Sequence, residues 1–506
     1  MSRPGFALEV DERTPPLLVR SGSALRLERF SLGTQVVYAP DAEAWGDPTA
    51  LTSAALAAPL AGAPIADQLK PGMRLTITFS DVTVPTPWAR DDVRRVLVEH
   101  VLQAAATAGV DDVVLIAANG LRRRLTARDQ QALLGERICR SFAGDDRLGS
   151  HDAADAEALT TVGVVDGTDV ALNRRVVESD LVIHVGVVTE RGHGGWREIA
   201  TGLGSAETID LVNGLRGRGD EVADVVAGAV NVVTVSGVLG QPAYSGALRF
   251  LASREWEWSI KDQLAYLAVR RALATAPVET SRALYGSRSE PYPVVAVFSG
   301  PMTEVHTAAQ RALAEVQTVP VKGQADILVS GVPNPISMAP DADGTPLAPA
   351  WHVLSHVYGM GGDTPIVREG GAVIGFSKLG ERFSSRHHSA GADFVAEVLP
   401  QTTDPAQIAA TYQPRFASDP WYLELYRHRN AFHPLHPFHL WYAMQPAIQA
   451  CPDIVWVGAD RRTAEVMGFR AATTYADALE ICSTRLGRRP KVTYVRASGQ
   501  VQVRLS

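Results

Sequence analysis

The chain has 506 residues, of which 46% are hydrophobic and 20% charged, and its formal net charge is -7. This length is sufficient for two or three folded domains, and the composition excludes a largely disordered chain. Because Lys and Arg are not in excess, general binding to nucleic acid or to an anionic membrane is not expected, and a small-molecule ligand is favoured.

The cysteines and the start of the chain indicate a reducing compartment. Cys139, Cys451 and Cys482 are far apart in the sequence, which favours neither a disulfide framework nor a thiolate metal site. Residues 1–12 lack the apolar core of a signal peptide. The longest apolar stretch, residues 225–239, is too short to span a bilayer and is interpreted as a buried helix end followed by a buried strand. We therefore expect a cytoplasmic protein.

The clearest structural unit lies in residues 74–118. Residues 75–79 and 113–117 have the β-branched, apolar character of buried strands, and the apolar spacing between them predicts an amphipathic helix. Asp91 and Asp92 suit the positive end of that helix. A strand, helix and strand in this order indicate a parallel sheet.

Further elements follow along the chain. A second helix is expected to start at Thr126, where Asp129 completes a capping box, and another strand is expected at residues 180–185. Residues 1–70, rich in Ala, Pro and Asp, give no clear pattern.

The polar, proline-containing residues 277–293 follow a helix predicted at 256–276 and suggest a domain boundary near residue 290. Strands alternate with helices beyond this boundary, which again predicts a parallel sheet. These later strands are predicted at residues 294–298, 326–329, 372–376 and 453–457, with a helix at 303–316.

Short motifs follow several of the predicted strands. After the first strand comes Ser-Asp-Val-Thr-Val-Pro-Thr-Pro at residues 80–87, and after the second comes Ala-Asn-Gly at 118–120. The second half contains Phe-Ser-Gly-Pro-Met at 298–302. The order and spacing of such segments, over roughly residues 74–214 and 293–496, resemble those of the nickel-pincer lactate racemase family.

The resemblance implies an α/β fold of two domains, residues 1–290 and 291–506, with mainly parallel sheets and a cleft between them. It also implies an isomerase, of the racemase or epimerase kind, that binds a small 2-hydroxy acid or another carboxylate.

The family's cofactor positions are replaced in this chain. In the family, a lysine after Gly-Gly-Arg carries the nickel-pincer nucleotide covalently, and a later histidine binds the nickel. The matching positions here are Arg197, after Gly194-Gly195-Trp196, and Asn213. A protonated guanidinium is a poor nucleophile and an amide is a poor ligand for this metal. We therefore expect a degenerate nickel site without the covalent cofactor.

The family's acid/base positions are replaced as well. One histidine position falls at Arg122, and the other falls in a shortened stretch between Gly186 and Arg197, where His193 is out of register. General acid/base catalysis contributes about 10²–10⁴-fold, which is far too little to racemise lactate without a hydride-accepting cofactor. The resemblance therefore supports the cleft rather than the family's own reaction.

The remaining polar residues form a candidate site. His193, with Glu190 nearby, and Asp81 at a strand end are the candidates for proton exchange. The candidate ligand-binding residues are Arg122, Arg197, Gly202, Gly204 and His388. Each has a plainer interpretation: a solvated histidine in a loop, solvated arginines, and a helix cap in the case of Asp81.

Three histidines, His433, His436 and His439, recur at intervals of three and suggest a zinc site. The prolines between them, Pro434 and Pro437, argue against a shared helix face, so we favour a packed aromatic connection and no resident metal. Two other functions stay open: a non-catalytic ligand-binding or sensing protein, and a metal-dependent hydrolase or lyase that uses these histidines. The sequence does not determine the oligomeric state.

Overall fold

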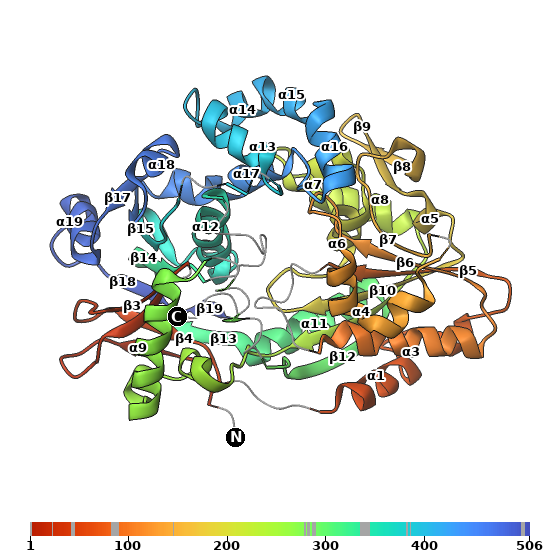
Figure 1. Ribbon diagram of the computed structural model, residues 1–506, viewed down its shortest axis with the longest axis horizontal. Coiled ribbons are helices and arrows are strands. Elements are labelled where there is room, and N and C mark those ends of the chain that lie inside the picture. Colours follow the sequence, from red (N-terminus) through yellow and green to blue (C-terminus); the bar gives the residue numbers. More distant parts are fainter. Residues whose placement is uncertain are drawn as a thin grey trace.

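Two main sheets, each the centre of one lobe, organise the chain (Figure 1). The computed structural model describes residues 3–506 apart from 23, 42–45, 82–90, 145, 278–279, 281–283, 286–289, 334–344, 381–382, 385 and 497–500. We call the lobe with the six-stranded sheet the N-lobe and the lobe with the seven-stranded sheet the C-lobe. In the part of the chain that is described, no helix is both long and apolar enough to cross a bilayer.

The N-lobe sheet has the strand order β12-β11-β10-β5-β6-β7 and is parallel except for β12, which runs antiparallel to β11. Its strands are β5 (Arg74–Ser80), β6 (Asp112–Ala118), β7 (Leu148–Ser150), β10 (Leu181–Val188), β11 (Val232–Leu239) and β12 (Val294–Pro301). Every residue of β10 and β11 is buried, because helices cover both faces of the sheet. The predicted unit of two strands and a connecting helix is confirmed in β5, α3 and β6.

Helices pack on the two faces of this sheet and form two apolar cores. They are α1 (Pro48–Ala57), α2 (Ile65–Gln68), α3 (Val93–Thr107), α4 (Ala127–Ser141), α5 (Arg174–Val177), α6 (Trp196–Leu203), α7 (Ala206–Asn213), α8 (Gly219–Ala229) and α11 (Met302–Gln317). The predicted capping box of α4 is present: Asp129 N–H donates to Thr126 Oγ1 at 3.2 Å, and Thr126 N–H donates to Asp129 Oδ2 at 2.8 Å. A hairpin of β8 (Leu159–Val165) and β9 (Thr168–Asn173) lies beside α8.

The C-lobe sheet has the order β1-β4-β18-β14-β15-β16-β17 and is parallel except for β1. Its strands are β1 (Phe6–Glu9), β4 (Gln35–Tyr38), β14 (Ala325–Gly331), β15 (Val367–Phe376), β16 (Asp453–Val457), β17 (Arg470–Ala472) and β18 (Val492–Val495). The strands predicted at residues 326–329, 372–376 and 453–457 are therefore confirmed.

Helical segments cover this second sheet as well. They are α12 (Leu347–Trp351), η5 (His352–Val357), η6 (Tyr358–Gly361), α13 (Ser389–Asp393), η7 (Phe394–Val398), α14 (Pro405–Thr411), α15 (Gln413–Ala417), α16 (Pro420–Arg429), α17 (His436–Ala450), α18 (Arg461–Val466) and α19 (Tyr475–Leu486). The segment η5 is a π-helical turn that continues from α12, a geometry that often marks functional sites. In Figure 1, α17 lies beside α7 of the N-lobe.

Smaller elements complete the fold. They are the hairpin β2 (Leu17–Ser21) and β3 (Ala24–Glu28), the parallel pair β13 (Thr318–Val321) and β19 (Gln502–Leu505), the helix α9 (Ile260–Thr275), and the single turns η1 (Ala156–Ala158), η2 (Gly246–Leu251) and η3 (Glu255–Glu257).

The expected division of the chain at residue 290 is corrected by the sheet pairings. Strand β12, which follows residue 290, pairs with β11 in the N-lobe, and α11 packs on these two strands. Strands β1 and β4, near the start of the chain, belong to the C-lobe sheet. Each lobe is therefore built from segments that lie on both sides of residue 290.

Candidate active site

Polar side chains stand in the otherwise apolar strands β10 and β11 of the N-lobe sheet. His184 of β10 is buried, and its Nδ1 forms a hydrogen bond of 2.9 Å with Thr78 Oγ1 of the neighbouring strand β5. This bond fixes the ring, so that Nε2 is the nitrogen that approaches Glu198. Nε2 of His184 has no hydrogen-bond partner among the described residues. A buried imidazole nitrogen is thus available to a ligand.

We call the space beside His184 the acid/base pocket. Its empty space is about 250 Å³, open solvent included. It is lined by His184, Gly186, Val188, Gly194, Gly195, Glu198, Thr234, Ser236, Met302, Val305 and His306. The pocket extends from the middle of β10 and β11 toward their carboxyl ends, and ligands commonly bind beyond these ends in parallel sheets.

A glycine turn closes one side of the acid/base pocket. Gly194 and Gly195 have φ angles of 91° and 77°, which favour glycine, and they lead directly into α6. A Cβ atom on Gly195 would lie 3.3 Å from the ring of His306. The two glycines therefore let the backbone approach His306 closely.

Glu198 supplies the carboxylate of the acid/base pocket from the first turn of α6. Its Oε1 lies 3.6 Å from Nε2 of His184, which is beyond hydrogen-bond distance. Burial alone would raise the pKa of Glu198, but the neighbouring His184, His193 and Arg122 outweigh burial and lower this pKa. Glu198 is therefore ionised at neutral pH.

His306 brings a second imidazole to the acid/base pocket from α11. Burial lowers its pKa, and the carboxylate of Glu198 opposes this shift only in part. Its Nδ1 has no hydrogen-bond partner within the described parts of the chain. One carboxylate and two imidazoles thus face the same small space.

Asp81 and Arg122 form a buried pair at the ends of β5 and β6. Arg122 Nε donates to Asp81 Oδ2 at 2.6 Å, and the Asp81 side chain is only 1% exposed. The side chain that caps α3 is that of Asp92. Arg94 holds the strand end in place by donating to the carbonyl oxygens of Ser80 and Asp81 at 2.8 and 2.5 Å. Residues 82–90, most of the first motif loop, lie outside the described residues.

The two lobes meet at a partly buried cluster around Glu190. Its Oε2 lies 3.4 Å from Nε2 of His193 in the same loop and 3.2 Å from Nδ1 of His356 in η5 of the C-lobe. Burial would raise the pKa of Glu190, but His356 and His193 lower it to about 2. Burial would lower the pKa of His356, but Glu190 outweighs burial and raises it. The predicted proximity of His193 and Glu190 is present, and the role of His193 in proton exchange stays a prediction.

Four of the predicted ligand-binding residues, Arg122, Arg197, Gly202 and Gly204, do not line the described pockets. Arg197 is 55% exposed and pairs with Asp220 at 3.0 Å, on the outer side of α6. The carbonyl oxygen of Gly202 accepts a hydrogen bond from Gly120 N–H, and that of Gly204 accepts one from His151 Nε2. Both glycines allow close packing, since a Cβ atom on Gly202 would lie 2.8 Å from Ala118. These contacts do not support the expectation that Arg197, Gly202 and Gly204 hold an anion, which stays untested.

We predict that Arg197→Ala leaves ligand affinity unchanged, because the guanidinium contacts Asp220 at the surface. Isothermal titration with a ligand that the unmodified protein binds checks this, with a change within about twofold expected for an exposed ion pair of small net energy. A decrease in ligand affinity of tenfold or more would show that Arg197 takes part in ligand binding.

The residues at the family's cofactor positions do not fit a tethered nickel complex. Arg197 offers a guanidinium that is already paired with Asp220. Asn213 is an exposed amide at the last residue of α7. Neither side chain supplies a linkable amine or an imidazole, so these two residues would not hold a tethered nickel complex.

The three regularly spaced histidines do not form a group that could hold a metal ion. The helix α17 begins at His436 with Pro437 in its first turn, where a missing N–H is tolerated, so our expectation that proline prevents a helix there is wrong. His439 Nε2 bonds to Asp210 Oδ1 at 2.9 Å, and His433 packs edge-on against Tyr426. Within the described ranges, no group of three or more His, Cys, Asp or Glu side chains could hold a metal ion.

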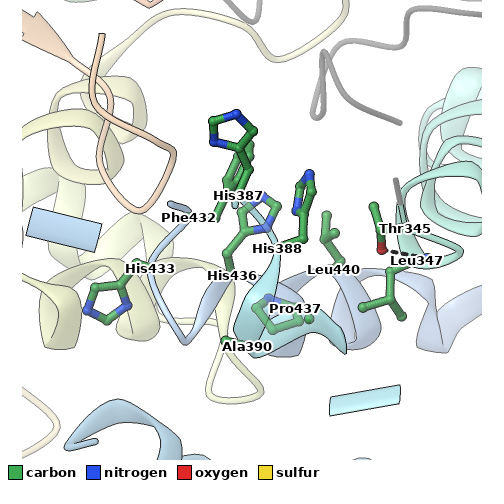
Figure 2. A pocket seen from close by; sticks show the side chains of 11 residues that line it. Thr345, Leu347, His387, His388, Ala390, Phe432, His433, His436, Pro437 and Leu440 are labelled. Atoms are coloured by element: carbon green, nitrogen blue, oxygen red, sulfur yellow. Dashed lines mark hydrogen bonds between the residues drawn. The ribbon is translucent and has the colours of Figure 1, made fainter. Parts of the chain in front are cut away.

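The predicted ligand residue His388 lies at a second pocket, in the C-lobe (Figure 2). Its ring stacks on Phe432 with centroids 4.6 Å apart. His436 packs against the same phenylalanine, with centroids 4.5 Å apart. A role for His388 in binding ligand stays a prediction.

Reasoning from the sequence alone missed His184 and Glu198. The signal for His184 was a single imidazole within the apolar run Leu-Val-Ile-His-Val-Gly-Val-Val of β10. The signal for Glu198 was an acidic residue in the first turn after a glycine pair. Arg197 precedes Glu198 by one residue, and this step turns a side chain by about 100° around the helix, away from the pocket.

Comparison with known proteins relates part of the chain to one family and nearly all of it to one fold. Residues 30–213 match the lactate racemase N-terminal domain family. The comparison with curated proteins gives no match. Among solved structures, the lactate racemase apoprotein from Thermoanaerobacterium thermosaccharolyticum has a TM-score of 0.62 at 16% identity, covering 97% of this chain and 100% of that one. A protein from Thermotoga maritima has a TM-score of 0.52 at 10% identity, covering 92% and 100%. Residues 30–213 thus match the lactate racemase N-terminal domain family, and nearly the whole chain shares the fold of the lactate racemase apoprotein.

Proposed function

We propose that the protein is an isomerase-type enzyme that binds a small carboxylate ligand, such as a 2-hydroxy acid, and moves a proton on it without a covalent pincer cofactor. The observation that carries this proposal is the acid/base pocket. There the Glu198 carboxylate and Nε2 of His184 stand 3.6 Å apart and face one space without bonding to each other. A carboxylate and an imidazole so placed can act as base and acid on one ligand.

The neighbouring residues have supporting roles in this proposal. Arg122, held by Asp81, would pair with the ligand's carboxylate, because a guanidinium offers several donors to one anion. Glu198 would accept the proton, and His184 or His306 would return one. Thr78 fixes the orientation of His184 through its hydrogen bond to Nδ1.

The proposal also restricts the substrate. Acid/base catalysis supplies about 10²–10⁴-fold, so the hydrogen that is removed must already be acidic. A hydrogen next to a ketone or aldehyde carbonyl meets this condition, whereas C2–H of a simple 2-hydroxy acid is much less acidic. We therefore expect the fastest exchange with acids that carry a hydroxyl group beside a keto group.

Deuterium exchange tests the proposal directly. The protein would be incubated in deuterated water with a panel of 2-hydroxy acids and hydroxy-keto acids, and incorporation at carbon would be followed by proton NMR. We expect exchange without any added cofactor. Exchange that needs added pincer cofactor would contradict the proposed mechanism. Binding without exchange for every acid would favour the non-catalytic alternative.

A further inference from the structure

The pocket of Figure 2, which we call the imidazole pocket, is separate from the acid/base pocket and lies in the C-lobe. It encloses about 280 Å³, open solvent included. It is lined by Thr345, Leu347, His387, His388, Ala390, Gly391, Phe432, His433, His436, Pro437 and Leu440. Four of these side chains are imidazoles and none of the described lining residues is a carboxylate, so a negatively charged group meets no like charge among them.

His436 is the central polar group of the imidazole pocket. It is 6% exposed, and its Nε2 has no hydrogen-bond partner in the described parts of the structure. Such an unpaired buried nitrogen is costly, because its hydration is lost without replacement. A ligand atom that bonds to Nε2 would remove this cost.

The backbone around His436 also favours an anion. His436 is the first residue of α17, which is 15 residues long, so the positive end of the helix dipole lies at the pocket. The residue before the helix is Leu435, which forms no side-chain cap hydrogen bond at this end.

The charges near His436 also favour an anion in this pocket. Burial lowers the pKa of His436 well below its usual value, and His388, His439, Arg122 and His433 lower it further. Electropositive neighbours that disfavour a proton on this ring also attract an anion, which would offset them.

We propose that the imidazole pocket binds an oxyanionic group, a carboxylate or a phosphate, of a small molecule, with Nε2–H of His436 as a donor. The inference goes beyond the proposed function, because it holds whether or not Glu198 transfers a proton. The positive charge of Arg122 lowers the pKa of both Glu198 and His436.

The test is an NMR titration of the full chain labelled with ¹⁵N-histidine. The probes are lactate, inorganic phosphate, and lactamide as the uncharged analogue of lactate. We expect the His436 signals to shift and saturate with lactate, with phosphate or with both, and not with lactamide. The more effective anion identifies the class of group. No saturable shift of His436 with either anion would overturn the inference, even if lactate shifts His184.

A matched set of variants gives a second measurement. His436→Phe keeps a ring against Phe432 and removes the donor, so the dissociation constant of the effective anion is expected to rise at least about tenfold. His436→Gln should restore part of the affinity, and His428→Gln, which replaces an exposed histidine, should change nothing. Unchanged affinity in a folded His436→Phe variant would overturn the inference. If that variant fails to fold, the titration of the unmodified protein decides.

Discussion

Replacing Glu198 with Gln is expected to reduce the rate of deuterium exchange at least about a hundredfold, because the variant lacks the base that accepts the proton. Gln has nearly the same size and keeps an oxygen near His184, so the fold and the pocket should persist. The measurement is kcat and KM for the most reactive acid of the panel. We expect kcat to fall while KM changes little, since Arg122 rather than Glu198 is proposed to hold the carboxylate.

The matched control for this variant is Glu207→Gln, which changes an exposed carboxylate on the next helix, α7. Its kcat should equal that of the unmodified protein. A Glu198→Gln variant with undiminished exchange would show that another group removes the proton, and His193 beside Glu190 would be the next residue to replace.

Replacing Glu190 with Gln is expected to lower the free energy of unfolding by about 2 kcal/mol, a typical value for buried hydrogen bonds to a charged group. Glu190 contacts His193 in the N-lobe and His356 in the C-lobe, and both Glu190 and His356 are only 12% exposed. The loss should therefore weaken the contact between the lobes.

The pH dependence of this stability follows from the two pKa shifts. Folding lowers the pKa of Glu190 from 4.5 to about 2, so its contribution is present above pH 4.5 and is lost as the pH falls toward 2. Folding raises the pKa of His356 above 6.5, so its contribution is complete below pH 6.5 and is lost as the pH rises through the folded-state value. The difference between the two proteins should be greatest between pH 4.5 and 6.5.

Urea unfolding of the unmodified protein and of Glu190→Gln across this pH range is the measurement. Glu136→Gln, which removes an exposed carboxylate paired with Arg140, is the control and should change stability by less than about 0.5 kcal/mol. A constant difference at all pH values would mean that the ionisation of Glu190 does not stabilise the interface.

Sequence patterns predicted those parts of the fold that depend on local periodicity. The apolar runs of β5, β6 and β14 predict buried parallel strands, and the capping box of Thr126 and Asp129 predicts the start of α4. The pairing of strands could not be predicted in this way. Nothing local in residues 6–9 or 294–301 shows that the first belongs to the C-lobe sheet and the second to the N-lobe sheet.

Local sequence patterns likewise predicted only part of the candidate site. Asp81 and Arg122 were selected because they follow strands, and the parallel sheet brings these strand ends together. Arg197 was selected by its position in a motif, but one residue of helical rotation directs Glu198 rather than Arg197 to the pocket. The contact between Glu190 and His356 joins residues that are 166 positions apart and left no local signal.

The position of β18 bears on how the protein can be synthesised. This strand, Val492–Val495, lies between β4 and β14, so β4 has no parallel neighbour until the last residues have been made. A nascent chain must therefore keep β1 and β4 unpaired with the rest of their sheet while more than 450 residues leave the ribosome. Exposed strand edges invite aggregation, so slow translation should make this protein depend on chaperones that shield its first forty residues or so.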